Sequence, residues 1–293
     1  MRPPPVEPEL RRWTMSDGYV ISGRFWPPRR RHPRRPIIYL HGIQSHGGWF
    51  AHSASLLAEA GEGVLLPDRR GSGLNEVARG DVPRAERWLA DLDELADWLA
   101  RQYGTPRCDV VGVSWGGKLA AAWGVQRPER VVRLLLIAPG LYPAVDVGLR
   151  GRLAIGRALL TAGGGRQFDI PLQDPALFTD NPDGQRFIRR DRLKLTQATA
   201  RFFWYSRRLD RMVLRGPGGH LRAETTLVLA EEDRIIRNQP TIGWARRATG
   251  GTVRIISLPG AHTLEFAEDP EQFWQVVRNW ASQRRNLPAA GET

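Results

Sequence analysis

Residues 112–117, Gly112-Val113-Ser114-Trp115-Gly116-Gly117, decide the fold of this chain. They follow the apolar run 108–111 and precede an alanine-rich helical pattern that begins at Lys118, which predicts a strand, a sharp turn and a helix. Glycines two positions before and after Ser114 leave room for a backbone bend that a Cβ atom would forbid. Ser114 is therefore a candidate nucleophile, and the alternative is that it is an ordinary helix N-cap.

The composition is typical of a globular protein. Hydrophobic residues make up 41% of the 293 residues, and no apolar run approaches the roughly 18 residues of a membrane span. Residues 1–5 lack the apolar core of a signal peptide, so we expect a cytoplasmic protein. The single cysteine, Cys108, excludes an internal disulfide, and the spacing of the six histidines does not favour a metal site.

The formal net charge of +12 suggests an anionic partner. Lysine occurs only at Lys118 and Lys194, and the arginines are scattered except in the run 29–35, which reads as a solvated loop. Nucleic-acid binding favours clustered cations, so we expect no nucleic-acid partner. Attraction to an anionic lipid surface fits the pattern better.

Strands and helices alternate over the first half of the chain. Residues 1–12 are expected to be frayed, and two antiparallel strands over 13–15 and 19–26 flank the turn residues Asp17-Gly18. Buried strands are then predicted at 36–40, 64–68, 108–111 and 131–138, with helices at 49–60, 84–103 and 118–126. This alternation predicts an α/β fold with a doubly wound, mostly parallel sheet.

The alternation stops at about residue 141. Residues 141–222 show no convincing strand and carry two helical patterns, a basic amphipathic one over 148–160 and another over 187–214. Strands return at 225–230 and 252–258, with helices at 238–248 and 268–284. We therefore expect a core of residues 1–140 and 223–293 and a helical cap of residues 141–222.

The loops after the last two strands supply partners for a serine nucleophile. A serine hydroxyl needs a base within hydrogen-bond reach and a third group to orient that base. Asp233 lies three residues after the strand 225–230, and His262 follows the last strand. The order Ser, Asp, His is typical of one family of folds. Glu231 and Glu232 are alternatives to Asp233 as the orienting acid, and His220 is an alternative to His262 as the base.

Several motifs surround these residues. They are Asp17-Gly18, His41-Gly42, Asp68, Gly71-Ser72-Gly73, the elbow 112–117, the acidic stretch 231–235 and the histidine stretch 260–266. With them the chain resembles α/β-hydrolases of the lysophospholipase and monoacylglycerol lipase type, related to the serine aminopeptidase-like hydrolases, over roughly residues 13–284. The resemblance implies a mostly parallel central sheet with helices on both faces and an inserted helical cap.

The resemblance also implies roles for single residues. Ser114 is the nucleophile, Asp233 the acid and His262 the base, and the backbone N–H groups of Ile43 and Trp115 form the oxyanion hole. His41 and Gly42 are expected at the substrate site, although for His41 a ring that bonds loop backbone is favoured over a direct chemical role. No metal or organic cofactor is required.

The expected substrate is a small-molecule acyl ester, most simply a lysophospholipid or monoacylglycerol, with peripheral membrane contact through the basic cap. Alternatives are an aminopeptidase or amidase, an acyltransferase, and a hydrolase-fold binding protein without catalysis. Lys118 departs from the family pattern, because a cation near a helix N-terminus is disfavoured. We expect it to pair with a buried acid such as Asp68 or to attract an anionic head group.

Overall fold

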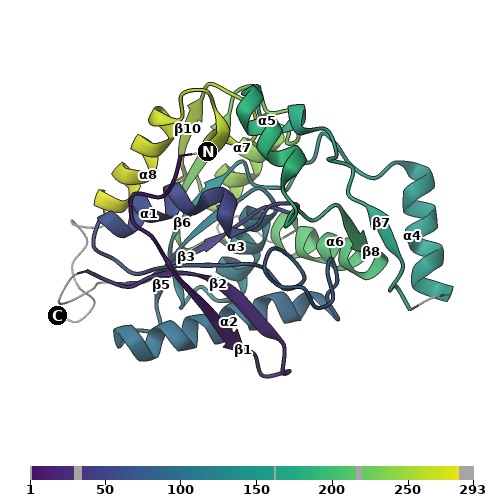
Figure 1. Ribbon diagram of the computed structural model, residues 1–293, viewed down its shortest axis with the longest axis horizontal. Helices are drawn as coiled ribbons and strands as arrows, with labels where there is room; N and C mark the ends of the chain where they lie inside the picture. Colours follow the sequence, from purple (N-terminus) through teal and green to yellow (C-terminus); the bar gives the residue numbers. More distant parts are fainter. Residues whose placement is uncertain (1, 30–34, 162, 216–219, 284–293) are drawn as a thin grey trace.

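The fold is built on a central sheet of eight strands (Figure 1), described by a computed structural model over residues 2–29, 35–161, 163–215 and 220–283. The strand order is β1-β2-β4-β3-β5-β6-β9-β10. The strands are β1 (Glu9–Thr14), β2 (Val20–Trp26), β3 (Ile37–Leu40), β4 (Val64–Pro67), β5 (Cys108–Val113), β6 (Val131–Ile137), β9 (Glu224–Ala230) and β10 (Arg254–Leu258). Within this sheet the β1–β2 and β2–β4 pairings are antiparallel, and the other pairings are parallel. The predicted mostly parallel sheet is confirmed.

Strand β5 lies at the centre of the sheet, between β3 and β6. All residues of β3, β4 and β5 are buried, which explains their continuous apolar sequences. Leu40 is in register with Gly112, and Val113 with Ile137. Because parallel strands end at one edge, the loops after β3, β5, β6, β9 and β10 meet there. Ser114 is the first residue beyond β5 at this edge.

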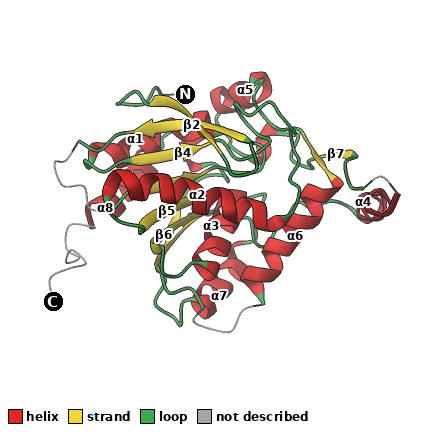
Figure 2. Cartoon of the chain, turned by 90° about the horizontal axis from the view of Figure 1, so that it is seen from below, coloured by secondary structure: helices red, strands yellow, loops and turns green. Residues whose placement is uncertain are grey.

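Helices cover both faces of the sheet (Figure 2). Outside the cap they are η1 (Gly47–Phe50), α1 (Ala51–Glu59), α2 (Ala85–Tyr103), α3 (Trp115–Gln126), α7 (Asn238–Ala248), η3 (Leu264–Phe266) and α8 (Glu271–Gln283). Helix α1 packs against α8, and α2 packs against α3. The helices predicted at 49–60, 84–103, 238–248 and 268–284 are confirmed within a few residues.

The first strand begins earlier than predicted. Residues 1–12 are expected to be frayed, but β1 begins at Glu9, which is in register with Phe25 of β2. The backbone groups along the edge of β2 need hydrogen-bond partners, and residues 9–14 supply them. The side chains of β1 are mostly exposed, so their sequence pattern does not indicate a strand. Of the basic run 29–35, residues 30–34 lie outside the described residues.

The cap is an insertion between β6 and β9, which are neighbours in the sheet. It contains α4 (Leu149–Thr161), β7 (Gln167–Asp169), η2 (Pro175–Leu177), α5 (Pro182–Arg190), β8 (Gln197–Thr199) and α6 (Ala200–Leu214). Figure 1 shows α4, β7 and β8 together at one end of the molecule. The inserted helical cap is confirmed, whereas the bounds 141–222 stay a prediction.

Two details of the cap were predicted wrongly. The expected single helix over 187–214 is two helices, since α5 ends at Arg190 and α6 begins at Ala200. Between them β8 pairs antiparallel with β7, where no strand was expected. The Thr199 side chain accepts a hydrogen bond from Phe202 N (3.1 Å) and so caps α6. The pairing partner of β8 lies beyond α5, so local hydrophobic periodicity could not reveal it.

Candidate active site

The turn between β5 and α3 holds Ser114 in a strained conformation. Its φ of 54° and ψ of −122° lie outside the regions that L residues favour. Neighbouring backbone enforces this conformation, because Ser114 N–H donates to Ile137 O (2.9 Å) and Gly140 N–H donates to Ser114 O (2.7 Å). Ser114 occupies the N-cap position of α3, but its side chain makes no capping hydrogen bond there and its backbone is not in the extended region of an ordinary N-cap residue.

The glycines on both sides of Ser114 are required by close backbone contacts. A Cβ atom on Gly116 would lie 2.3 Å from Leu40 O, and a Cβ atom on Gly112 would lie 2.7 Å from Gly116 O. Both distances are far inside van der Waals contact with backbone atoms that cannot swing away. The two glycines of the G-x-S-x-G pattern are therefore required because β5, α3 and the end of β3 pack closely around the serine.

Asp233 and His262 form a buried pair beside the carboxyl ends of the strands. His262 Nδ1 lies 2.8 Å from Asp233 Oδ2, and their side chains are 2% and 0% exposed. Asp233 Oδ1 accepts the backbone N–H groups of Ile235 and Ile236, both at 2.8 Å. A carboxylate fixed in this way holds the proton on Nδ1 and leaves Nε2 as the free base of the ring.

The second ring nitrogen of His262, Nε2, makes no hydrogen bond to Ser114. Its Nε2 is buried and has no hydrogen-bond partner among the described residues. The structure thus joins His262 to Asp233 but forms no hydrogen bond between His262 and Ser114 within the described chain. Such a contact often tightens only when substrate binds.

The rival residues lie elsewhere. Glu231 and Glu232 are exposed, in contrast to the Asp233 carboxylate. His220 Nε2 lies 3.2 Å from Val213 O at the end of α6. None of these side chains is hydrogen-bonded to His262 or Ser114 among the described residues.

The loop after β3 lies against the serine. A Cβ atom on Gly42 would be 3.4 Å from Ser114 Cβ and 3.1 Å from Ser45 Oγ, so the loop passes close to the serine. Ile43 and Trp115 both line the cavity that Ser114 opens into. Their backbone N–H groups donate no hydrogen bond within the described residues. These two groups are therefore free to bind an oxygen in the cavity, as the predicted oxyanion hole requires.

His41 holds this loop in place. Its Nδ1 lies 2.9 Å from Gly42 O, and its Nε2 accepts the Arg69 backbone N–H (2.8 Å). Burial and the nearby Arg69 guanidinium lower the pKa of His41 well below its usual range, so the ring is neutral with its proton on Nδ1. Both ring nitrogens thus bond loop backbone, which favours the structural role for His41.

Lys118 pairs with an acid of the cap. Its Nζ lies 2.7 Å from Asp210 Oδ1 and 3.3 Å from Ser206 Oγ, both on α6. The expected pairing with Asp68 is wrong, because Asp68 instead accepts the backbone N–H groups of Gly47 (2.6 Å) and Leu74 (2.8 Å). The partner of Lys118 could not be predicted, since it depends on where the cap docks.

A cavity of about 680 Å³ opens above Ser114 between the core and the cap. Its floor includes Ser114 and Trp115. Most of its wall is apolar and comes from the cap and the loop after β9, including Ile155, Leu159, Ile170, Leu172, Phe203, Leu214, Ile235 and Ile236. Its charged side chains are Lys118, Asp146, Arg152, Arg207, Asp210 and Arg237.

The residues that the structure describes contain no cluster of three or more His, Cys, Asp or Glu side chains arranged to hold a metal ion. None of their helices is both long and apolar enough to cross a bilayer.

Several curated proteins are similar to this chain over part or most of its length. An uncharacterized abhydrolase domain-containing protein of Dictyostelium discoideum is 26% identical over 281 residues, which cover 92% of this chain and 28% of that protein. The chain thus spans less than a third of that relative. A 2-hydroxymuconate semialdehyde hydrolase of Pseudomonas putida is 28% identical over 75% of this chain and 77% of its own length. The human monoglyceride lipase is 27% identical over 42% of this chain and 41% of its own length.

Solved structures share the fold. Monoglyceride lipase of Saccharomyces cerevisiae superposes with a TM-score of 0.81 at 15% identity, covering 96% of this chain and 99% of that one. Monoacylglycerol lipase of Paleococcus ferrophilus gives a TM-score of 0.76 at 18% identity, covering 94% and 99%. At such low identity these similarities establish the α/β-hydrolase fold, which the sequence resemblance predicted.

Family membership rests on the sequence profile. The profile described as serine aminopeptidase, S33, matches residues 31–268, which include the elbow, the cap and the loops of Asp233 and His262. The strained serine, its required glycines and the buried His262–Asp233 pair all lie inside this match. The chain therefore belongs to the serine aminopeptidase S33 family of α/β-hydrolases.

Proposed function

We propose that this protein is a serine hydrolase that cleaves carboxylic esters of single-chain lipids. Ser114 is the nucleophile, His262 the base and Asp233 the acid. The observation that carries the proposal is a strained serine on the floor of a large apolar cavity, next to a loop with free backbone N–H groups. The buried His262–Asp233 pair adds a base whose Nε2 has no other partner among the described residues.

The proposed mechanism follows from these groups. His262 Nε2 takes the proton from Ser114 Oγ as that oxygen attacks the ester carbonyl, and Asp233 stabilises the resulting imidazolium. The N–H groups of Ile43 and Trp115 bind the oxyanion, a contribution of about 3–4 kcal/mol for each donor in comparable enzymes. His262 then protonates the leaving alcohol. Water, deprotonated by the same ring, cleaves the acyl-enzyme and releases the acid.

The cavity supports a lipid-like substrate. Aliphatic and aromatic side chains suit an acyl chain, whereas the charged groups on one part of the wall suit a polar or anionic head group. Relatives and fold neighbours include monoglyceride lipases. A lysophospholipid or a monoacylglycerol fits both observations.

The cap also carries a surface suited to a membrane. Leu149, Leu153 and Leu160 of α4 are 74%, 67% and 89% exposed, and Trp204 of α6 is 49% exposed. Exposed leucines on a helix that also carries arginines are typical of segments that lie on anionic lipid. We propose that this surface contacts membranes peripherally. The cytoplasmic location stays a prediction.

An aminopeptidase or amidase is the alternative that the family description suggests. Such an enzyme needs an acid free to bind a substrate ammonium group. The acids that line the cavity are already paired, Asp210 with Lys118 and Asp146 with arginines. Asp169, Asp174, Asp180 and Asp183 do not line it. This favours an ester over an aminoacyl amide.

Fluorophosphonate labelling tests the nucleophile. The wild type should label, Ser114→Ala should not, and Ser45→Ala should label normally. Ser45 is a matched control, because it is also buried near Gly42 and its Oγ has no hydrogen-bond partner among the described residues. An unlabelled wild type would favour a binding protein without catalysis, and equal labelling of Ser114→Ala would refute the assignment.

A substrate panel tests the rest of the proposal. It contains a monoacylglycerol, lysophosphatidylcholine, short p-nitrophenyl esters and aminoacyl amides. We expect the single-chain lipid esters to have the highest kcat/KM. Preference for the amides would contradict the ester assignment, and product esters formed with an added alcohol would indicate an acyltransferase.

A further inference from the structure

Arg69 is a buried cation that forms no ion pair with a carboxylate among the described residues, although the charge of the neighbouring Asp68 acts on it. It is 8% exposed, and no carboxylate oxygen of the described residues lies within 4.0 Å of its guanidinium. Burial lowers the pKa of Arg69 to about 9, which reflects the cost of keeping this charge away from water. A buried charge is expensive unless its surroundings compensate it, so its contacts need an explanation.

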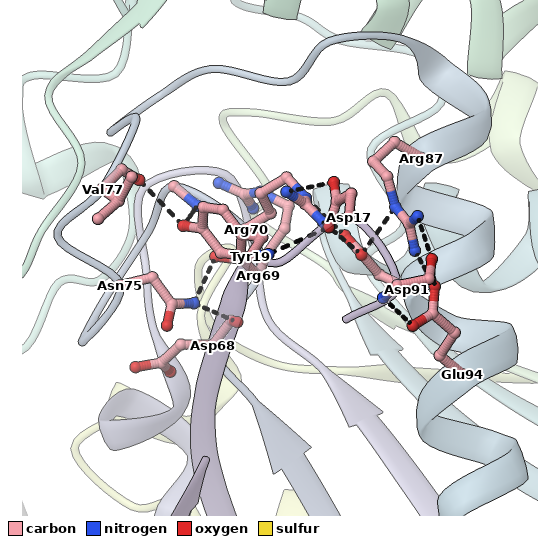
Figure 3. A network of polar contacts seen from close by, with 12 residues as sticks. Asp17, Tyr19, Asp68, Arg69, Arg70, Asn75, Val77, Arg87, Asp91 and Glu94 are labelled. Carbon is pink, nitrogen blue, oxygen red and sulfur yellow. Dashed lines mark hydrogen bonds and ion pairs between the residues drawn. The ribbon is translucent and has the colours of Figure 1, made fainter. Parts of the chain in front are cut away.

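The neighbouring arginine shows the ordinary arrangement. Arg70 donates to Asp91 through Nε (2.9 Å) and Nη2 (2.7 Å), and its Nη1 lies 3.0 Å from Asp17. Figure 3 shows Arg70 in this network of acids, above the Tyr19 ring. Arg69, one position earlier, points its guanidinium into a different set of partners.

The guanidinium of Arg69 binds the loop after β3. Its Nη1 donates to Gly42 O and its Nη2 to Ile43 O, both at 3.0 Å. Its carbon lies 4.7 Å from the centroid of the Trp115 ring and 5.3 Å from that of Phe202. One side chain therefore contacts both residues whose N–H groups are proposed to bind the oxyanion.

A second route connects Arg69 to the same peptide. The Arg69 backbone N–H donates to His41 Nε2 (2.8 Å), which places the ring proton on Nδ1, and Nδ1 then donates to Gly42 O (2.9 Å). Gly42 O thus accepts from both the guanidinium and the imidazole. This oxygen belongs to the same peptide unit as the Ile43 N–H group. Donation to the carbonyl polarises the peptide and makes its N–H a stronger donor.

We propose that Arg69 is a positioning residue that orients and polarises the Gly42–Ile43 peptide and packs against Trp115, so that both oxyanion donors face the reacting carbonyl. The inference rests on the proposed function, since it concerns the oxyanion hole of that reaction. Arg69 touches neither substrate nor Ser114 in this role. Its effect is on the transition state, where the oxyanion is present, rather than on substrate binding.

The test compares Arg69→Met with Arg69→Lys and with a matched control. Arg79→Met is the control, because Arg79 also donates to backbone carbonyls, those of Gly73 (3.0 Å) and Leu193 (3.0 Å), but away from the oxyanion loop. Steady-state kinetics with a p-nitrophenyl ester give kcat and KM. Affinities are measured for a trifluoromethyl ketone, which Ser114 converts to a tetrahedral oxyanion, and for an ether analogue of equal chain length, which cannot react.

For Arg69→Met we expect kcat to fall about 10- to 100-fold with KM nearly unchanged, somewhat less than the loss of a whole oxyanion donor. Trifluoromethyl ketone affinity should fall by a similar factor and ether affinity should not change. Arg69→Lys should recover part of kcat, and Arg79→Met should match the wild type.

Other outcomes overturn the inference. An unchanged kcat in folded Arg69→Met would do so, and so would equal weakening of both inhibitors, which indicates general disruption of the site. If Arg69→Met does not fold, kcat and the affinities of the two inhibitors are measured for Arg69→Lys instead, and its melting temperature shows whether it is folded. A wild type that neither labels nor hydrolyses any ester would instead refute the proposed function.

Discussion

The stability of the protein should depend on pH through Glu265, which lies three residues after His262 in η3. Its side chain is buried, and Oε1 accepts the backbone N–H of Ser53 in α1 (3.0 Å). Burial raises the pKa of Glu265 from 4.5 to about 7. The difference of roughly 2.5 pH units corresponds to about 3 kcal/mol, at 1.36 kcal/mol per unit.

The sign follows from proton linkage. The folded state keeps the Glu265 proton up to about pH 7, whereas the unfolded chain releases it near its ordinary pKa, so unfolding releases a proton between these values. The contribution to stability is complete below about pH 4.5 and is lost as the pH rises through about 7. Above pH 7 the folded state must hold a buried carboxylate, and among the described residues no cation forms an ion pair with it.

Urea unfolding of Glu265→Gln measures the effect. Glutamine has the shape of the protonated acid but cannot ionise, so the variant should gain up to about 3 kcal/mol relative to the wild type between pH 5 and pH 8. Glu268→Gln is the matched control, because Glu268 is exposed on the same loop. Equal pH dependence in Glu265→Gln and the wild type would refute the reasoning.

Three further predictions follow from the contacts. Gly116→Ala should lower the free energy of unfolding by about 1–3 kcal/mol or more and abolish esterase activity, because its Cβ would lie 2.3 Å from Leu40 O; thermal unfolding and ester hydrolysis measure both. Lys118→Met should cost up to about 3–5 kcal/mol in chemical denaturation, since the buried Asp210 would lose its contact at 2.7 Å and keep only the longer ion pair with Arg207 (3.6 Å). Leu153→Ser should weaken binding to anionic vesicles about tenfold in a flotation assay while stability stays within about 0.5 kcal/mol.

Each of these predictions has a control. Gly243→Ala, at a helical position of α7 where the Cβ atom would meet only the end of the Arg247 side chain at 3.4 Å, should be harmless. The double variant Lys118→Met, Asp210→Leu should recover much of the stability lost in Lys118→Met. Zwitterionic vesicles should bind wild type and Leu153→Ser weakly and alike. A harmful Gly243→Ala, a double variant no more stable than the single one, or equal binding of both proteins to anionic vesicles would each contradict the corresponding argument.

The sequence predicts the sheet and the elbow well, because both depend on local signals. Buried parallel strands are continuous apolar runs, and the glycines around Ser114 follow from the backbone packing of that turn. Asp233 and His262 could be proposed from chain order alone, since the carboxyl ends of parallel strands meet at one edge. Their roles stay a proposal.

What the sequence could not predict depends on docking between distant segments. The acid partner of Lys118 is Asp210 of α6, and nothing near Asp210 in the chain marks it as a buried acid. The sequence also cannot tell which of Arg69 and Arg70 carries the ion pairs, because the two are chemically alike and adjacent. Only the turn after β4 decides that Arg70 faces Asp91 and Arg69 faces the loop of Gly42.

The direct pairing of β6 with β9 bears on how such a protein could diversify. The chain leaves the sheet and returns beside its point of departure, so the cap contributes nothing to the register of the sheet. A differently shaped cap could replace it without disturbing the serine, provided that it docks on α3. That docking uses Ser206, which accepts from Trp115 Nε1 (2.9 Å), and Asp210, which pairs with Lys118. Because these two positions are one helical turn apart, a transplanted cap that keeps these contacts would carry a hydroxyl and a carboxylate four residues apart on its docking helix, together with an aromatic side chain that packs on Trp115 as Phe202 does.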